Sequence, residues 1–102
     1  MANGKKIDVD RTSSLLKAVS DSDRLKIVLL LREGKKNVGT LAKAIGAEIV
    51  NVSHHLSVLR SKKVVNTQKV GRFVYYTLNP DYMRQDGNTI HFQLGGCKLI
   101  IH

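Results

Sequence analysis

Apolar residues recur along the first half of this 102-residue chain with the spacing of α-helices. A first helix is predicted from about Asp10 to Val19, with Asp10 as its N-cap. The next, from Arg24 to Arg32, is apolar on almost every side, which indicates a central, buried helix. Gly34 is expected to end it in a left-handed conformation. Both helices should therefore contribute to one small core.

A third helix is predicted over residues 38–45, because apolar residues at positions 38, 41, 42 and 45 form one stripe. Gly46 supplies a tight turn. A fourth helix follows over residues 49–61, with a core face made of Ile49, Val52, Leu56 and Leu59. Its opposite face is polar. Two short helices joined by such a turn are typical of a helix-turn-helix unit.

Strand-like patterns replace the helical ones after residue 63. The β-branched run Val64–Val70, the turn Gly71-Arg72 and the segment Phe73–Leu78 predict a β-hairpin, with its aromatic residues covering the core. A hairpin directly after a helix-turn-helix is a wing. We therefore expect an α+β, mainly α fold, a winged helix-turn-helix, with the helix at 49–61 in the major groove of DNA and the wing at 64–78 on the backbone or in the minor groove.

The last segment predicts a second β-hairpin, from Thr89 to His102, in place of a final helix. Gly95-Gly96 is a favoured two-residue loop, and it places Leu94 opposite Cys97. One face of this hairpin is then apolar and must pack on the first helix or on a second chain, because an isolated hairpin is unstable in water. The candidate dimer interface consists of Leu15, Leu16, Val19, Ile90, Phe92, Leu99 and Ile101.

The chain divides into a flexible tail at 1–9, a DNA-binding unit at 10–80 and a packing or dimerisation element at 81–102. No apolar run approaches the ~18 residues of a membrane span, and no signal peptide is visible. Cys97 is the only cysteine, so an intrachain disulfide is excluded. A buried, inert thiol is expected there, with an intersubunit redox disulfide as the alternative. These features favour a cytoplasmic, prokaryotic-type nucleoid-associated protein.

Positive charge is concentrated in the predicted reading unit. Residues 34–80 hold eight basic residues and one acid, Glu48, so that +7 of the net charge of +9 lies there. Such a concentration indicates a polyanion partner more than a merely solvated surface. Backbone or wing contacts to DNA are predicted for Lys35, Lys36, Lys43, Ser57, Arg60, Lys62, Lys63, Lys69 and Arg72.

Base contacts are predicted at the N-terminal end of the helix at 49–61, which is the part of a recognition helix that reaches base edges. The candidates are Val50, Asn51, Ser53 and His54. Asn51 can pair with adenine, and Val50 can pack on a thymine methyl group. The alternative is that these are only exposed positions. His55, about 100° further round the helix, is expected to turn towards the core as a hydrogen-bonded structural histidine.

Neither an enzyme nor a metal site is indicated. The sequence has no glycine-rich phosphate loop and no nucleophile with an evident base, and adjacent histidines on a helix diverge too far to hold one metal well. We therefore expect no catalytic residue, no metal ligand and no cofactor, and the effector is unknown.

Four motifs resemble the ArsR/SmtB family of regulators. They are the segments 16–34 (LKAVSDSDRLKIVLLLREG), 40–46 (TLAKAIG), 52–60 (VSHHLSVLR) and 71–78 (GRFVYYTL), in the order of that family's buried helix, helix-turn-helix and wing. The resemblance implies a homodimeric transcriptional regulator, usually a repressor, that binds inverted repeats. Metal sensing is not implied, because residues 37–40 lack the Cys, His or carboxylate ligands of metal-sensing members.

Three functions therefore remain open from the sequence. The first is a homodimeric, sequence-specific regulator that binds double-stranded DNA. The family resemblance implies that it acts as a repressor. The alternatives are a winged-helix protein-interaction module and a low-specificity nucleic-acid binder. The charge of residues 34–80 argues against the protein-interaction module, since it favours a polyanion.

Overall fold

The computed structural model describes residues 7–94 and 97–102. Its elements are α1 (Val9–Ser20), α2 (Ser22–Leu31), α3 (Val38–Ile45), α4 (Ile49–Ser61), β1 (Val65–Val70), β2 (Phe73–Leu78), β3 (Met83–Asp86), β4 (Thr89–Leu94) and β5 (Cys97–Ile101). The order of helices, wing and C-terminal strands confirms the α+β winged helix-turn-helix expected from the sequence.

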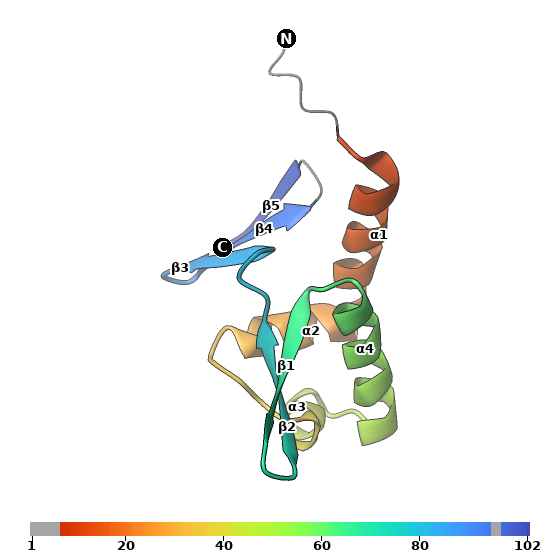
Figure 1. Cartoon of the computed structure of the whole chain (residues 1–102), viewed down its shortest axis with the longest axis vertical. Helices are drawn as coiled ribbons and strands as arrows, with labels where there is room; N and C mark the ends of the chain where they lie inside the picture. Colours follow the sequence, from red (N-terminus) through yellow and green to blue (C-terminus); the bar gives the residue numbers. More distant parts are fainter. Residues whose placement is uncertain (1–6, 95–96) are drawn as a thin grey trace.

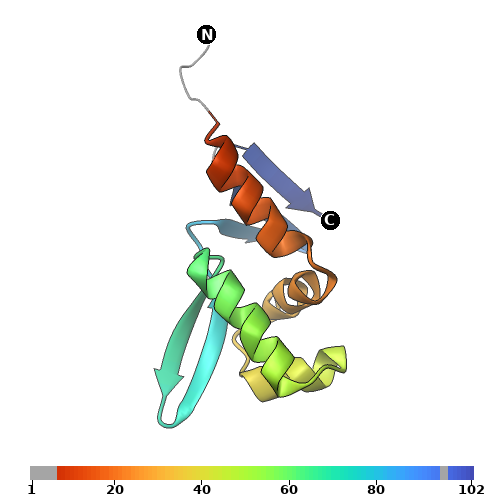
Figure 2. The same cartoon turned by 90° about the vertical axis from the view of Figure 1, so that its right-hand side faces the viewer.

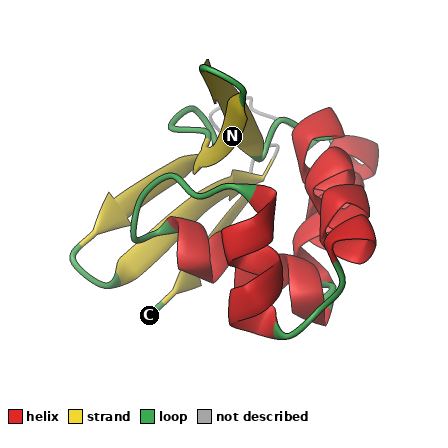
Figure 3. Ribbon diagram, turned by 90° about the horizontal axis from the view of Figure 1, so that it is seen from below, coloured by secondary structure: helices red, strands yellow, loops and turns green. Residues whose placement is uncertain are grey.

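The elements form two connected halves (Figure 1). The lower half holds α2, α3, α4 and the wing, β1 and β2, whose tip points down beside α3. The upper half holds α1 and a three-stranded sheet, and α1 lies along this sheet in the view turned by 90° (Figure 2). From below, the helices gather on one side of the molecule and the strands on the other (Figure 3).

The N-cap of α1 differs from the sequence prediction, whereas the glycine after α2 agrees with it. Asp8, and not Asp10, caps α1, because its carboxylate accepts from the N–H of Arg11 at 3.1 Å. Helix α2 ends at Leu31, and Gly34 follows its C-cap, Arg32, by two residues at φ +124°, a positive φ that favours glycine, as predicted. Asp8 and Asp10 are the same residue type and so have the same intrinsic cap preference, which is why the sequence did not distinguish them.

One continuous core joins the two halves. Ile27 of α2, Leu41 of α3 and Leu56 of α4 belong to the same buried cluster as Ile90 and Phe92 of β4. Helix α2 is central, as predicted. Burial of aliphatic groups, each worth about 1.5–3 kcal/mol when complete, therefore stabilises the DNA-binding unit and the C-terminal sheet together.

Ile49 is an exception to the predicted core face of α4. Its side chain is 55% exposed, whereas Val52, Leu56 and Leu59 are fully buried. The helix begins at Ile49, and no element packs over its first residue on that side. A stripe drawn from spacing alone does not show where the neighbouring elements stop.

The C-terminal strands form a larger sheet than the predicted hairpin. Strands β4 and β5 pair in the predicted register, with Phe92 opposite Leu99 and Ile90 opposite Ile101. Strand β3, which was not predicted, pairs with β4 on its other side. Thr12 of α1 donates its hydroxyl to the carbonyl of Leu94 at 2.7 Å, so the sheet packs on α1 of the same chain. The Gly95-Gly96 loop and the side chain of Cys97, with the predictions made for them, lie outside the described residues.

Candidate nucleic-acid interface

The N-terminal half of α4 presents a side that no other element covers. Val50 is 75% exposed, and Asn51, Ser53 and His54 are exposed around it. On the opposite side Val52 is fully buried. The structure therefore brings the four predicted base-contact residues together on one accessible surface.

The first turn of α4 also has free backbone donors. The N-cap residue, Glu48, makes no side-chain hydrogen bond to the helix, whereas the caps of α1, α2 and α3 each do so. The first N–H groups of a helix have no partner within it and carry a partial positive charge. They are suited to a phosphate oxygen beside the exposed face.

The turn between α3 and α4 sets the angle of the recognition helix. Asn37 caps α3 by accepting from the N–H of Thr40 at 2.8 Å. Gly46 then ends α3 at φ +70° and ψ +34°, and the N–H of Ala47 donates to the carbonyl of Ala42 at 3.0 Å. A left-handed residue at this place is favourable only for glycine, so the tight reversal depends on Gly46.

Arg24 connects α4 to the first two helices. Its Nε donates to the carbonyl of Ala18 at 2.6 Å, and its Nη1 lies 3.2 Å from Nδ1 of His55. The His55 ring also lies between two carboxylates, with Nδ1 3.9 Å from an oxygen of Asp21 and Nε2 3.8 Å from an oxygen of Asp23. His55 is thus the partly buried structural histidine that was predicted.

Asp21 closes the same cluster from the N-terminus of α2. Its pKa is lowered from 3.8, chiefly by the backbone N–H of Arg24 and also by the charges of Arg24 and His55, while desolvation opposes the shift. The role of Arg24 was not predicted from the sequence. The only signal was the aspartate–arginine–leucine run at residues 23–25.

The wing tip offers a cation on an exposed aromatic ring. Gly71 turns the hairpin at φ +61°, and the guanidinium of Arg72 lies 5.7 Å from the centre of the Phe73 ring. Phe73 is 50% exposed, so the prediction that the wing aromatics cover the core is wrong at this position. At the other end of β2, Tyr76 does pack against the core. The wing, a two-stranded ribbon, extends beyond the helices. Phe73 lies at its tip and is therefore exposed, because it lies away from the core.

Lys36 does not fit a role in phosphate contact. Its side chain is 17% exposed and its Nζ lies 3.3 Å from a carboxylate oxygen of Glu33. Its backbone forms a bridge with Tyr76, which donates to the Lys36 carbonyl at 2.8 Å. This bridge holds the chain before α3 against the wing. Lys36 is therefore best explained as a structural residue, and it is the least suited of the predicted backbone contacts.

Five of the eight other predicted backbone contacts fall into two groups. Lys43 on α3, and Lys69 and Arg72 at the wing tip, lie at the lower end of the molecule with the start of α4 (Figure 1). Lys62 and Lys63 follow the last turn of α4, about 20 Å away along this 13-residue helix. Sequence spacing placed all of them in one basic unit and did not separate the two ends.

A polar depression lies beside Lys62 and Lys63, between α4 and α1. Arg11, Ser14 and Tyr82 line it as well. The guanidinium of Arg11 donates to the hydroxyl of Tyr82 and lies 5.4 Å from the centre of its ring. These cations belong to the upper half of the molecule, away from the base-contact residues.

The predicted dimer interface is partly used within the chain. Leu15, Val19, Ile90 and Phe92 are buried in the core, so they are not available to a partner in this conformation. Leu16, Leu99 and Ile101 instead line a surface groove between α1 and β5. The predicted interface is thereby reduced to three of its seven residues.

Within the described ranges, no three His, Cys, Asp or Glu side chains are grouped so that they could hold a metal ion. In the same ranges, no helix has the length and hydropathy needed to cross a membrane.

Comparison with known proteins identifies the family. Residues 21–67 match the bacterial regulatory proteins of the arsR family. The chain is 33% identical over 76 residues to the transcriptional repressor SdpR of Bacillus subtilis, covering 74% of this chain and 84% of SdpR. Several other relatives are longer, and the chain spans between 55% and 62% of their length.

Solved structures of similar fold lead to the same family. HlyU from Vibrio cholerae superposes with a TM-score of 0.67 at 32% identity, over 74% of this chain and 82% of HlyU, and that protein is described as a transcriptional activator. The homodimeric winged helix-turn-helix DNA-binding domain of Mb0332 from Mycobacterium bovis, a possible ArsR-family regulator, gives 0.68 at 27% identity, over 78% of each chain. These relatives are regulators and not enzymes. With its helix-turn-helix, its wing and these similarities, the chain belongs to the ArsR family of winged helix-turn-helix transcriptional regulators.

Proposed function

We propose that this chain is a homodimeric repressor that binds an inverted-repeat operator in double-stranded DNA, with α4 in the major groove. The observation that carries the proposal is the exposed face of Val50, Asn51, Ser53 and His54 at the uncapped start of α4. Amide, hydroxyl and imidazole groups there can reach base edges, and the free N–H groups behind them can reach a phosphate.

The wing supplies the second contact in this proposal. Arg72 and Lys69 project at its tip, at the same end of the molecule as the start of α4 (Figure 1). Arginine favours the narrow minor groove because of its negative potential, and lysine favours the phosphates beside it. Each subunit would then grip one half-site at two places, and a dimer would do so across a two-fold axis.

Repression and the homodimer are proposed from the relatives. SdpR is a repressor that this chain matches over 84% of its length, and Mb0332 is described as homodimeric. HlyU is described as an activator, so the direction of regulation needs its own measurement. In vitro transcription from the chain's own promoter is expected to fall when the protein is added, and a rise would replace repression with activation.

The DNA-binding test is a titration against a duplex from the chain's own upstream region and against random duplex. Tight binding that prefers the upstream duplex is expected. Asn51→Ala and His54→Ala should each weaken it by about 1–3 kcal/mol, since each removes a contact to the DNA.

Asn88→Ala is a matched control, because Asn88 is an exposed asparagine on the turn between β3 and β4, away from α4. It should bind as the unmodified protein does. Equal affinity for both duplexes would instead indicate a low-specificity nucleic-acid binder. The absence of binding to either would favour a protein-interaction module.

A further inference from the structure

Strand β5 is an edge strand with unpaired backbone groups. The strand order is β3-β4-β5, so within the described residues only one side of β5 is paired. The N–H of Gln93 donates to the carbonyl of Tyr82, towards β3. Its partner on β5, Lys98, therefore lies at a non-hydrogen-bonded position of the β4–β5 ladder. By alternation, the N–H and C=O groups of Lys98 and Ile100 point outwards, to the open edge.

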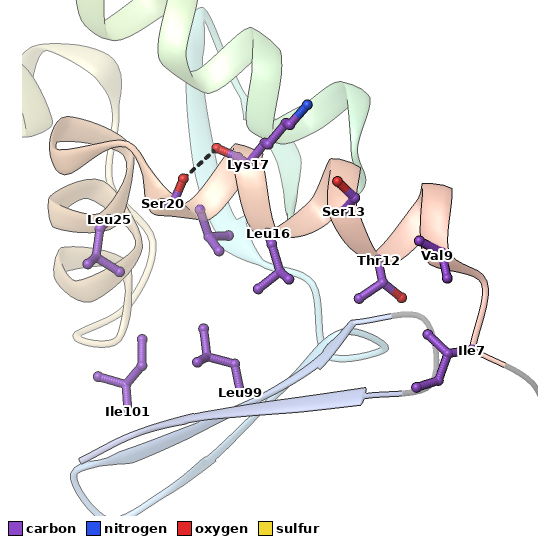
Figure 4. Close-up of a pocket in the computed structure, with 11 residues that line it drawn as sticks. Ile7, Val9, Thr12, Ser13, Leu16, Lys17, Ser20, Leu25, Leu99 and Ile101 are labelled. Atoms are coloured by element: carbon purple, nitrogen blue, oxygen red, sulfur yellow. Dashed lines mark hydrogen bonds between the residues drawn. The ribbon is translucent and has the colours of Figure 1, made fainter.

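An apolar groove runs beside this edge, between β5 and α1 (Figure 4). Its volume is about 670 Å³, and Leu16 of α1 faces Leu99 and Ile101 of β5 across it. Leu16 is 40% exposed, and Val9 and Ile7 are more exposed still. Among the described residues that line it, Lys17 alone is charged. The sheet thus extends beyond the cover that α1 provides.

An open edge next to an exposed apolar face is a combination that proteins usually cover. Unpaired N–H and C=O groups on a strand form a template for another strand. The remaining exposed large apolar side chains outside this region lie on α4 and the wing, at the end assigned to DNA. The groove and the β5 edge therefore form a surface separate from the one assigned to DNA.

We propose that β5 pairs antiparallel with β5 of a second copy, which joins two three-stranded sheets into one continuous sheet. This inference rests on the homodimer of the proposed function and specifies its interface. A two-fold axis perpendicular to the sheet at Leu99 aligns the outward groups of Lys98 with those of Ile100 of the partner subunit. The same axis places the two sheet faces that pack on α1 on the same side of the joined sheet. The two α1 helices therefore lie side by side over it.

A second copy fits this surface for three reasons. The pairing is isologous, so each copy offers the edge that the other needs. The groove lining is apolar on both copies, so Leu16 and its symmetry mate bury each other without requiring an opposite charge. Of the two open edges of this sheet, β3 and β5, only the edge of β5 adjoins the apolar groove, so pairing there also covers the groove.

The pairing of the β5 edges is tested by measuring the dimer dissociation constant of the full chain by sedimentation equilibrium. Ile100→Pro removes an outward N–H and leaves the ladder to β4 intact, since proline is tolerated at edge positions. The dimer dissociation constant should rise by about tenfold or more, because each dimer loses two hydrogen bonds. Gln85→Pro is the matched control: it makes the same change at an outward position of β3, on the opposite edge, and should leave dimerisation unchanged.

A second pair of variants tests the groove. Leu16→Glu puts a charge between the two α1 helices and should weaken the dimer by at least about tenfold. Val74→Glu changes a side chain that is also 40% exposed, but on the wing, and should not affect dimerisation. Circular dichroism identifies any variant that fails to fold.

Hydrogen exchange tests the unmodified protein directly. In the dimer, the amides of Lys98 and Ile100 should be protected, and dilution to the monomer should expose them while Leu99 stays protected by β4. A dimer in which Lys98 and Ile100 exchange freely would overturn the edge pairing and leave the homodimer intact. A chain that stays monomeric at all concentrations, and binds DNA as a monomer, would instead overturn the homodimer itself.

Discussion

Arg24 shows how one side chain positions the recognition helix. It hydrogen-bonds the last turn of α1 through Ala18, lies within the first turn of α2, and contacts His55 of α4. Asp21 receives the N–H of Arg24 at 3.1 Å and so fixes the start of α2 in the same cluster. Each contact is modest by itself, at about 0.5–1.5 kcal/mol for a typical hydrogen bond. Together they fix α4 against α1 and α2 through His55, next to the exposed His54.

At this scale we predict that Asp21→Ala lowers the free energy of unfolding by about 1 kcal/mol at neutral pH, because it removes the N-cap of α2. Urea denaturation measures the change. Asp10→Ala is the control, since Asp10 lies in the first turn of α1 but is not its cap. A larger loss for Asp10→Ala than for Asp21→Ala would contradict the assignment.

The effect of Asp21 should depend on pH. A lowered pKa means that the folded state favours the carboxylate, so the stabilisation is complete above the ordinary value of 3.8. It is lost as the pH falls below 3.8 and the carboxyl group becomes protonated. The stability difference between the unmodified protein and Asp21→Ala should therefore shrink in that acid range, and a difference that stays constant there would refute the charge contribution.

Between elements, Asn79 joins the wing to the end of α4 and to the C-terminal sheet. It is 93% covered, and its Nδ2 donates to the carbonyl of Lys63 at 2.7 Å. Its Oδ1 accepts from the N–H of Asp81 at 3.0 Å, and its own N–H donates to Val64. Lys63 has the only positive φ among the described non-glycine residues, +63°, so Asn79 holds a strained corner.

We therefore predict that Asn79→Ala lowers the free energy of unfolding by about 1–3 kcal/mol, since it removes two part-buried hydrogen bonds, to the carbonyl of Lys63 and from the N–H of Asp81. Thermal or urea denaturation measures it. Asn66→Ala, at an exposed position of β1, should change stability by less than about 0.5 kcal/mol. Equal effects of the two substitutions would show that Asn79 has no connecting role.

For the whole molecule, the distribution of charge governs DNA affinity. If a dimer neutralises six to ten phosphates, affinity should fall by about 10³–10⁵ between 50 and 200 mM salt. A shallow dependence would contradict the binding mode. Because the cations lie at two ends of α4, they should not contribute equally.

Arg72→Ala should flatten the slope of log affinity against log salt by about two, because each subunit loses one cation that neutralises phosphate charge from the minor groove. Lys36→Ala is the charge-matched control, because Lys36 is largely covered and paired with Glu33. It should leave the slope unchanged. A slope that responds to Lys36 and not to Arg72 would place the interface away from the wing tip.

Local sequence was sufficient for most elements. Helices α3 and α4, the turn at Gly46, the wing and the register of β4 with β5 follow from periodicity and turn residues, which act over a few neighbouring positions. The exposed face of Val50, Asn51, Ser53 and His54 follows from the same 3.6-residue period. Strand β3 was missed because Met83–Asp86 is short and mostly polar, and only pairing with β4 makes it a strand.

Local patterns along the chain were therefore enough to predict the family, all elements but β3, and the exposed face of α4. Which apolar side chains are buried in the core, and which stay exposed on the surface, depends on the tertiary fold. Leu15 and Leu16 are adjacent and equally apolar, yet Leu15 is buried and Leu16 lines the groove. The difference arises because burial depends on where β4 and β5 lie against α1, and such long-range packing is not contained in the spacing of residues along one helix.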